Sequence, residues 1–179
     1  MKRIFPMLLC AALLAATAPA SAQVPPQGKV QRVGHGHAPI CASEGADIAC
    51  VVARFYACAA SRDAALCAQL GLAEIPKLVE TPQTVEFAIE RTSAIEAKDV
   101  TDDLKHLPWF RPGYLLVEAQ ARRCPADGSC QAEEWDDWQI YIRRDETTAQ
   151  IVYWRGDSEP DQPPEIPDSF RAPAPAPAE

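Results

Sequence analysis

Cysteine is the residue type in this chain whose number and spacing predict chemistry most directly. Six of the seven cysteines lie beyond residue 22: Cys41, Cys50, Cys58, Cys67, Cys124 and Cys130. An even set of cysteines in an exported chain is typical of a disulfide framework. Zinc or redox chemistry usually needs closer spacing, such as CxxC, and the chain contains none. The cysteines therefore predict structural disulfides.

A second candidate set is polar and falls on segments that alternate like strands. It comprises Arg91, Glu118, Tyr141 and Arg143. Alternation from Phe87 and Ile89 places Arg91 on a buried face, where its charge would need a carboxylate partner or an anionic ligand. The alternative, which we favour, is that Arg91 lies near a strand end and reaches solvent. The set defines a candidate pocket for a small molecule.

Two large aromatic residues, Trp109 and Phe110, lie between Pro108 and Pro112. Such a pair either plugs one end of a core or forms an exposed binding lip. We expect the plug and keep the lip as the alternative.

Two further groups resemble metal ligands in type but not in arrangement. His35 and His37 could bind copper or nickel weakly, but two ligands make a poor site. An acidic strip could chelate calcium, but it lacks a glycine-containing loop; it comprises Glu133, Glu134, Asp136 and Asp137. We expect the two histidines to lie in a polar tail and the acidic strip to form a solvated hairpin edge. We predict no metal and no cofactor.

A helix pair within residues 47–70 would organise these residues. Its apolar stripe has a 3.6-residue period and comprises Ile48, Val51, Val52, Phe55 and Ala59. Asp47 is the expected N-cap, Ser61 is expected to cap the second helix, and Gly71 is expected to end it. The face opposite the stripe is rich in alanine, which suits either an exposed surface or close packing of another segment.

The helix pair also ranks the possible disulfides. Cys58 and Cys67 lie symmetrically about the expected turn, so a bond between them would join the two helices. Cys41 lies in a segment that can drape over the outer face of the first helix and reach Cys50. The last pair, Cys124–Cys130, flanks a turn-rich loop.

Four segments alternate apolar and polar residues, as half-buried strands do: residues 84–97, 114–124, 135–144 and 150–155. Short loops join the last three, so we expect an antiparallel meander. The first also suits a helix. The predicted fold is α+β, with an N-terminal helix pair packed on a curved four-stranded antiparallel sheet. We expect a cone-like roll stapled by disulfides.

The chain divides into four parts by composition. Residues 1–22 resemble a secretory signal peptide, with cleavage expected after Ala22, and a lipoprotein anchored at Cys10 is the less favoured alternative. Residues 23–40 are expected to be a flexible linker, 41–156 a single disulfide-stapled domain, and 157–179 a disordered acidic tail rich in Pro and Ala. The expected location is the periplasm or the exterior, and no run is long enough to span a membrane.

The net charge of the whole chain is −8, and it becomes more negative if the basic leader is removed. This charge argues against a broad basic surface for nucleic acid.

The helical segment resembles the first hairpin of nuclear-transport-factor-2-like domains. The resemblance is carried by Val52, Arg54, Phe55, Tyr56, Ala57, Asp63 and Leu66. Those domains are cone-shaped α+β rolls of the cystatin-like group, and they include ketosteroid-isomerase-like enzymes and non-catalytic binding modules. The isomerase relatives place a tyrosine at the position of Phe55, which has no hydroxyl to stabilise an oxyanion. No aspartate here matches their general base.

Two hypotheses about function follow. The first is a non-enzymatic exported module that binds an envelope protein partner. The second is a small-molecule-binding protein or enzyme that uses the interior of the cone. The sequence does not predict the oligomeric state.

Overall fold

The computed structural model describes residues 25–34, 37, 39, 41, 47–102, 104–125, 130 and 134–156. The expected leader and the expected acidic tail lie outside the described residues. The elements are, in order, β1 (Gln31–Gly34), α1 (Ile48–Ser61), α2 (Ala64–Gln69), β2 (Thr84–Ala94), η1 (Ala97–Asp99), β3 (Leu115–Cys124), β4 (Asp136–Arg144) and β5 (Ala149–Gly156). Within the described part, no helix combines the length and apolar character that a membrane crossing requires.

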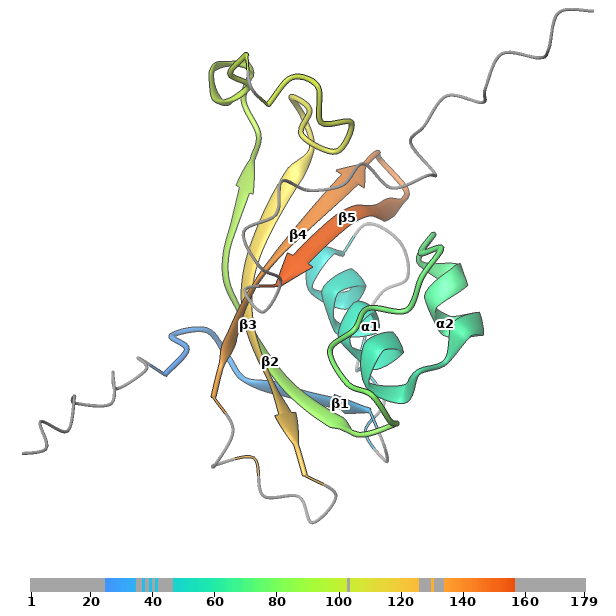
Figure 1. Ribbon diagram of the computed structural model, residues 1–179. Helices are drawn as coiled ribbons and strands as arrows, with labels where there is room; N and C mark the ends of the chain where they lie inside the picture. Colours follow the sequence, from blue (N-terminus) through green and yellow to red (C-terminus); the bar gives the residue numbers. More distant parts are fainter. Residues whose placement is uncertain are drawn as a thin grey trace, which may run out of the picture.

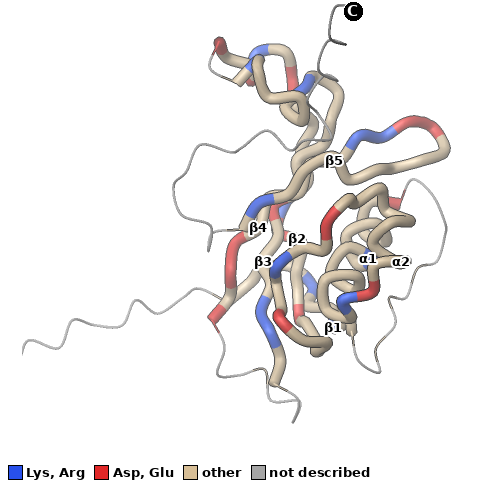
Figure 2. The backbone as a smooth tube through the Cα atoms, turned by 45° about the vertical axis from the view of Figure 1, so that its right-hand side comes forward, with Lys and Arg blue, Asp and Glu red and all other residues tan. Residues whose placement is uncertain are grey.

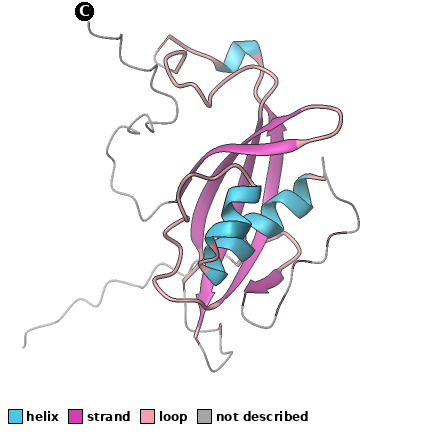
Figure 3. Ribbon diagram, turned by 90° about the vertical axis from the view of Figure 1, so that its right-hand side faces the viewer, coloured by secondary structure: helices cyan, strands magenta, loops and turns pink. Residues whose placement is uncertain are grey.

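The fold is α+β, as predicted, with one antiparallel sheet in the order β1-β2-β3-β4-β5. Both helices lie on the same side of this sheet (Figures 1 and 3). The predicted four strands were one too few, because β1 lies in the segment that we expected to be a linker. β1 has only four residues and is fixed by pairing with β2, where Val33 lies opposite Val85. A strand this short has no local periodicity of its own.

Helix α1 begins as predicted, with the Asp47 carboxylate accepting from the backbone N–H of Ala49 at 3.0 Å. Arg62 is its C-cap, and a φ of 58° places this residue in the left-handed region. The predicted cap of the second helix was wrong by two residues. Asp63, rather than Ser61, caps α2, because its Oδ1 accepts from two backbone N–H groups. Ser61 is the last residue of α1.

The core between α1 and the sheet is filled by aromatic rings. Tyr56 stacks on Phe87 with centroids 4.6 Å apart, and Phe55 and Tyr56 both meet Trp138 edge-on. Burial of each such side chain contributes about 1.5–3 kcal/mol. The alanine face of α1 is also buried, and β1 packs against this helix. The predicted cone-like shape stays a prediction, but the layers that it requires are present.

The three predicted disulfides are confirmed: Cys41–Cys50, Cys58–Cys67 and Cys124–Cys130. The Cys58–Cys67 bond is buried in the core and joins α1 to α2. The Cys41–Cys50 bond joins the segment before α1 to its first turn, and the Cys124–Cys130 bond closes the loop after β3.

A second apolar cluster lies on the sheet face that points away from α1. Trp109 is buried within it and stacks on Tyr153, with ring centroids 4.0 Å apart. Phe110 is half-buried against the same cluster, and its ring centroid lies 6.1 Å from that of Tyr141. The aromatic pair therefore plugs one end of the sheet. The alternative of an exposed lip is wrong for Trp109, because the connection between β2 and β3 folds back onto the strands.

Candidate functional site

The polar candidates lie on the outer face of the sheet, by which we mean the face that points away from α1. The inner face is apolar and carries Phe87, Val117 and Trp138. Residues one position away on each strand point to the outer face, because side chains alternate along a strand. The register places Arg91, Glu118, Gln139 and Arg155 side by side across four strands. Basic and acidic residues both occur along these strands (Figure 2).

A β-bulge in β2 brings Arg91 to this row. The register shifts between Ile89 and Arg91, and Glu90 is the extra residue. Simple alternation therefore fails at this point, and the inward-pointing orientation of Arg91, which we did not favour, is wrong. Arg91 is exposed and forms an ion pair with Glu118. This exposure matches the solvent-facing alternative that we favoured.

An open groove of about 450 Å³ lies along this row. Its lining comprises Glu90, Arg91, Glu118, Ala119, Gln120, Asp137, Trp138, Gln139 and Arg155. The volume lies within the range of ligand sites, but those sites are mostly apolar. This lining is mostly charged or amide-bearing, so it suits a polar ligand held by hydrogen bonds and charge.

Several polar groups of the groove have fixed partners. The Glu90 carboxylate accepts from the backbone N–H groups of Gln27 at 3.2 Å and Gly28 at 3.1 Å. Gln120 Nε2 donates to Asp137 Oδ1 at 2.8 Å. Gln120 Oε1 is buried and has no hydrogen-bond partner among the described residues. The carboxylates of Glu90 and Asp137 and the amide of Gln120 are therefore oriented by hydrogen bonds.

The other two candidates of the predicted pocket lie outside the groove. Tyr141 belongs to the second apolar cluster, and its hydroxyl donates to Gln139 Oε1 at 3.2 Å. Burial raises the pKa of Tyr141, against the opposing effect of the Arg155 charge. Arg143 is exposed at the β4–β5 hairpin and donates to Gln150 at 2.5 Å. The structure thus brings together Arg91 and Glu118 but not the full set of four.

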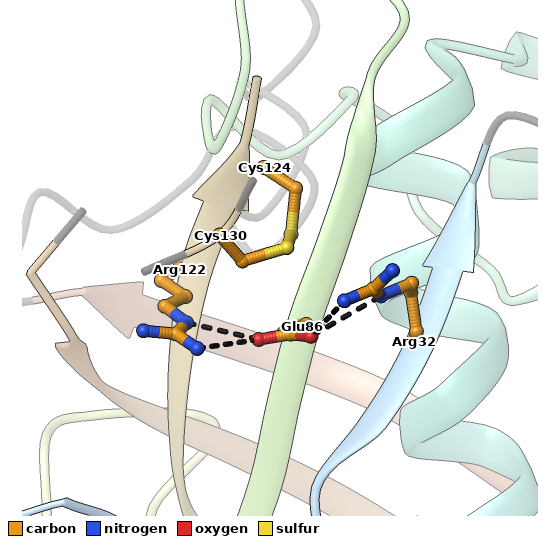
Figure 4. The surroundings of a disulfide bond; sticks show 5 residues. All are labelled: Arg32, Glu86, Arg122, Cys124 and Cys130. Atoms are coloured by element: carbon orange, nitrogen blue, oxygen red, sulfur yellow. Dashed lines mark hydrogen bonds and ion pairs between the residues drawn. A yellow bond between two sulfur atoms is a disulfide. The ribbon is translucent and has the colours of Figure 1, made fainter. Parts of the chain in front are cut away.

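Next to the groove, two residues beyond Gln120 on β3, lies Arg122, which with Arg32 encloses the buried carboxylate of Glu86 (Figure 4). Glu86 accepts from Arg32 at 2.5 Å and from Arg122 at 2.8 and 2.9 Å. Burial by itself would raise the pKa of Glu86, but the hydrogen bonds and charges of Arg32 and Arg122 lower it overall. Arg122 also lies over the ring of Trp135, 4.5 Å from its centroid. We call Arg32, Glu86 and Arg122 the charged triad.

The charged triad lies beside the Cys124–Cys130 disulfide (Figure 4). Potential ligand atoms of Glu86 and both cysteines lie within 4.8 Å of one another, the only such group of three among the described residues. The two sulfurs are bonded to each other, and both carboxylate oxygens accept from arginines. The arrangement is therefore a disulfide packed on an ion pair, and it offers no free donor set for a metal.

The predicted metal-ligand groups are only partly described. His35 and Glu133 lie outside the described residues, whereas His37 is exposed and its backbone pairs with Gly34. In the acidic strip, Asp137 is held by Gln120. Among the described residues, nothing favours a bound metal ion at His37 or at the acidic strip.

Two carboxyl groups, Glu86 and Asp145, have pKa values that do not suit a general acid. The pKa values of Glu86 and Asp145 are both lowered, the latter to about 2 by hydrogen bonds from Thr148 and Thr147. Both groups are therefore firmly ionised at neutral pH, whereas a general acid needs a raised pKa. Burial raises the pKa of Tyr56, but its hydroxyl lies in the core and has no partner among the described residues.

Five polar residues that line the groove were not among the predicted pocket residues: Glu90, Gln120, Asp137, Gln139 and Arg155. The alternation of β4 already placed Asp137 and Gln139 opposite the apolar residues, so a signal existed for these two. Arg155 falls on the outer face through the register of β4 with β5, which also shifts between Tyr141 and Ile142. No local pattern in β5 contains that shift.

No protein-family model matches the chain, and neither the curated proteins nor the solved structures give a match. The resemblance to nuclear-transport-factor-2-like domains therefore stays a prediction, which rests on residues of the first helical hairpin and on the order of helices and strands.

Proposed function

We propose that this protein is an exported, non-enzymatic module that binds an envelope protein partner through the outer face of its sheet. The observation that carries this proposal is the open groove with its oriented polar lining. Three disulfides support export, because such bonds form and persist in oxidising compartments.

The shape of the groove favours a polypeptide over a small molecule. Small-molecule sites usually bury most of their ligand within mainly apolar walls. This groove is open to solvent, its floor is one face of a sheet, and most of the residues that line it are charged or amide-bearing. An extended segment can lie along such a floor while keeping its other side in water.

The inner face offers less support for a ligand site. Aromatic rings fill the space between α1 and the sheet, and Phe55, Tyr56 and Trp138 contact one another there. A ligand inside the predicted cone would have to displace these rings. We therefore propose binding at the outer face.

An array of random-sequence peptides would test this proposal. The wild-type protein is expected to retain a subset of peptides that Gln139→Trp loses, because the new ring would fill the floor of the groove. Gln69→Trp on exposed α2 adds the same ring away from the groove and should retain the wild-type subset. Thermal melts would confirm that all three proteins are folded. Failure of the wild type to retain any peptide, or retention of the same subset by Gln139→Trp, would overturn the proposal.

A further inference from the structure

Three charged side chains of the groove have no ion-pair partner among the described residues: Glu90, Asp137 and Arg155. The Glu90 carboxylate is held by the backbone N–H groups of Gln27 and Gly28. Arg155 is exposed at the end of β5, and Asp137 is exposed at the start of β4. Asp137 uses Oδ1 to accept from Gln120. Since the neighbouring Arg91 is already neutralised by Glu118, these two opposite charges are the ones available to a partner.

The sheet register explains why Asp137 and Arg155 do not pair with each other. Arg155 lies opposite Gln139, and Asp137 lies two residues before Gln139 on the same face. Such diagonal neighbours have Cα atoms about 7–8 Å apart. Gln120 lies on β3, on the side of β4 away from β5, so its hydrogen bond draws the carboxylate away from Arg155. The two charges are therefore held at separate places in one groove.

The offset of these charges along the strands equals the repeat of an extended chain. Two residues of a strand rise about 6.8 Å, and their side chains lie on the same face. A segment lying along β4 with a basic residue and an acidic residue two positions apart would place a cation at Asp137 and an anion at Arg155. Adjacent residues would point to opposite faces and could not make both contacts.

We infer that the groove recognises an extended polypeptide segment that carries one basic and one acidic side chain two residues apart. The inference rests on the proposed function and specifies the chemistry of the partner. Charge complementarity selects the bound segment, because its basic side chain must reach Asp137 while its acidic side chain reaches Arg155.

Two capped pentapeptides of the same composition would test the spacing. In the first, one serine separates a lysine from a glutamate, and in the second the lysine and glutamate are adjacent. Both have glycine ends blocked by acetyl and amide groups. Titration of nitrogen-15-labelled protein should move the amide signals around Asp137, Gln139 and Arg155, with binding of the adjacent-charge peptide about fivefold weaker, as expected for loss of one partly exposed ion pair.

Charge-swapped variants would test the two contacts. Asp137→Lys and Arg155→Glu should each weaken binding of the first peptide. The double variant should recover most of it, because the peptide can then bind in the reverse direction. Arg144→Gln removes an exposed positive charge outside the groove lining and serves as the control; it should bind as the wild type does.

The outcomes separate this inference from the proposed function. Equal binding of the two peptides in the groove, or no recovery in the double variant, would overturn the inference and leave groove binding intact. Signal changes outside the groove, or none with either peptide while the random array gives groove-dependent binding, would also overturn it. In the array experiment, failure of the wild type to retain any peptide, or retention of the same subset by Gln139→Trp, would overturn the proposed function itself.

Discussion

Substitution of Glu86 by glutamine is expected to destabilise the protein markedly. The change keeps the size of the side chain but removes its charge, so the arginines of the charged triad lose their counter-ion. A hydrogen bond to a charged group contributes about 1.5–3 kcal/mol and a neutral one about 0.5–1.5 kcal/mol. The difference is about 1 kcal/mol for Arg122, which is 18% exposed, and less for Arg32, which is 40% exposed and better screened by solvent.

Repulsion between the two arginines adds to this loss, so the expected total is about 1.5–2.5 kcal/mol. That corresponds to a fall in Tm of roughly 5–8 °C for a domain of this size. Urea unfolding monitored by circular dichroism would measure the free energy of unfolding. Glu146→Gln, the same change at an exposed hairpin residue, is the matched control and should lie within about 0.5 kcal/mol of the wild type.

The pH dependence provides a second check on Glu86. Its pKa is lower in the folded protein than in the unfolded chain, so the unfolded state binds a proton more readily. The stabilisation is therefore fully present above the ordinary glutamate pKa and is lost as pH falls through the folded value. The stability gap between the wild type and Glu86→Gln should narrow below about pH 4.5.

Two results would refute this reasoning about the charged triad. One is a Glu86→Gln protein as stable as the Glu146→Gln control. The other is a stability gap that does not change with pH. A triple variant with Arg32→Met, Glu86→Leu and Arg122→Met should be more stable than Glu86→Gln, because it leaves no unpaired charge. If it is less stable, the loss in Glu86→Gln has another cause.

Three further experiments test the core and the backbone. Tyr56→Phe removes a buried hydroxyl that has no hydrogen-bond partner among the described residues, so it should be neutral or stabilising by up to about 1 kcal/mol. Tyr141→Phe loses the hydrogen bond to Gln139 and should cost about 1 kcal/mol. Urea unfolding would measure both, and a larger loss for Tyr56→Phe than for Tyr141→Phe would contradict these hydrogen-bond assignments. Replacement of Cys58 and Cys67 by serines should lower the free energy of unfolding by more than the roughly 2.5 kcal/mol expected for loop closure, because two hydroxyls enter the core. A smaller loss of stability in calorimetry would argue against a buried disulfide. Gly34→Ala should lower Tm more than Gly113→Ala, because both have positive φ but only at Gly34 would a Cβ clash with a backbone carbonyl; equal losses would refute the clash.

The parts of the fold predicted from sequence are those with a local cause. The α1 stripe has a 3.6-residue period, and the three disulfides follow from cysteines that face each other across short loops. The last three strands alternate and are joined by short connections. Each of these signals lies within one element or between elements adjacent in the chain, and each prediction was confirmed.

The parts that could not be predicted depend on distant contacts. β1 exists because four residues pair with β2, and its Arg32 is what allows Glu86 to be buried. Alternation placed Glu86 on the polar face correctly but gave no indication that two arginines would enclose it. Sequence patterns predict which face a residue occupies better than they predict what covers that face.

The bulge at Glu90 determines where the groove forms. It moves Arg91 to the outer face, where Glu118 can pair with it. The extra residue is held by backbone N–H groups of Gln27 and Gly28, up to 63 residues away in sequence. A Cβ at Gly28 would clash with the carbonyl oxygen of Ile89, so this close approach requires glycine. The segment expected to be a linker therefore sets the register beside the groove, and no pattern within β2 could have placed Arg91.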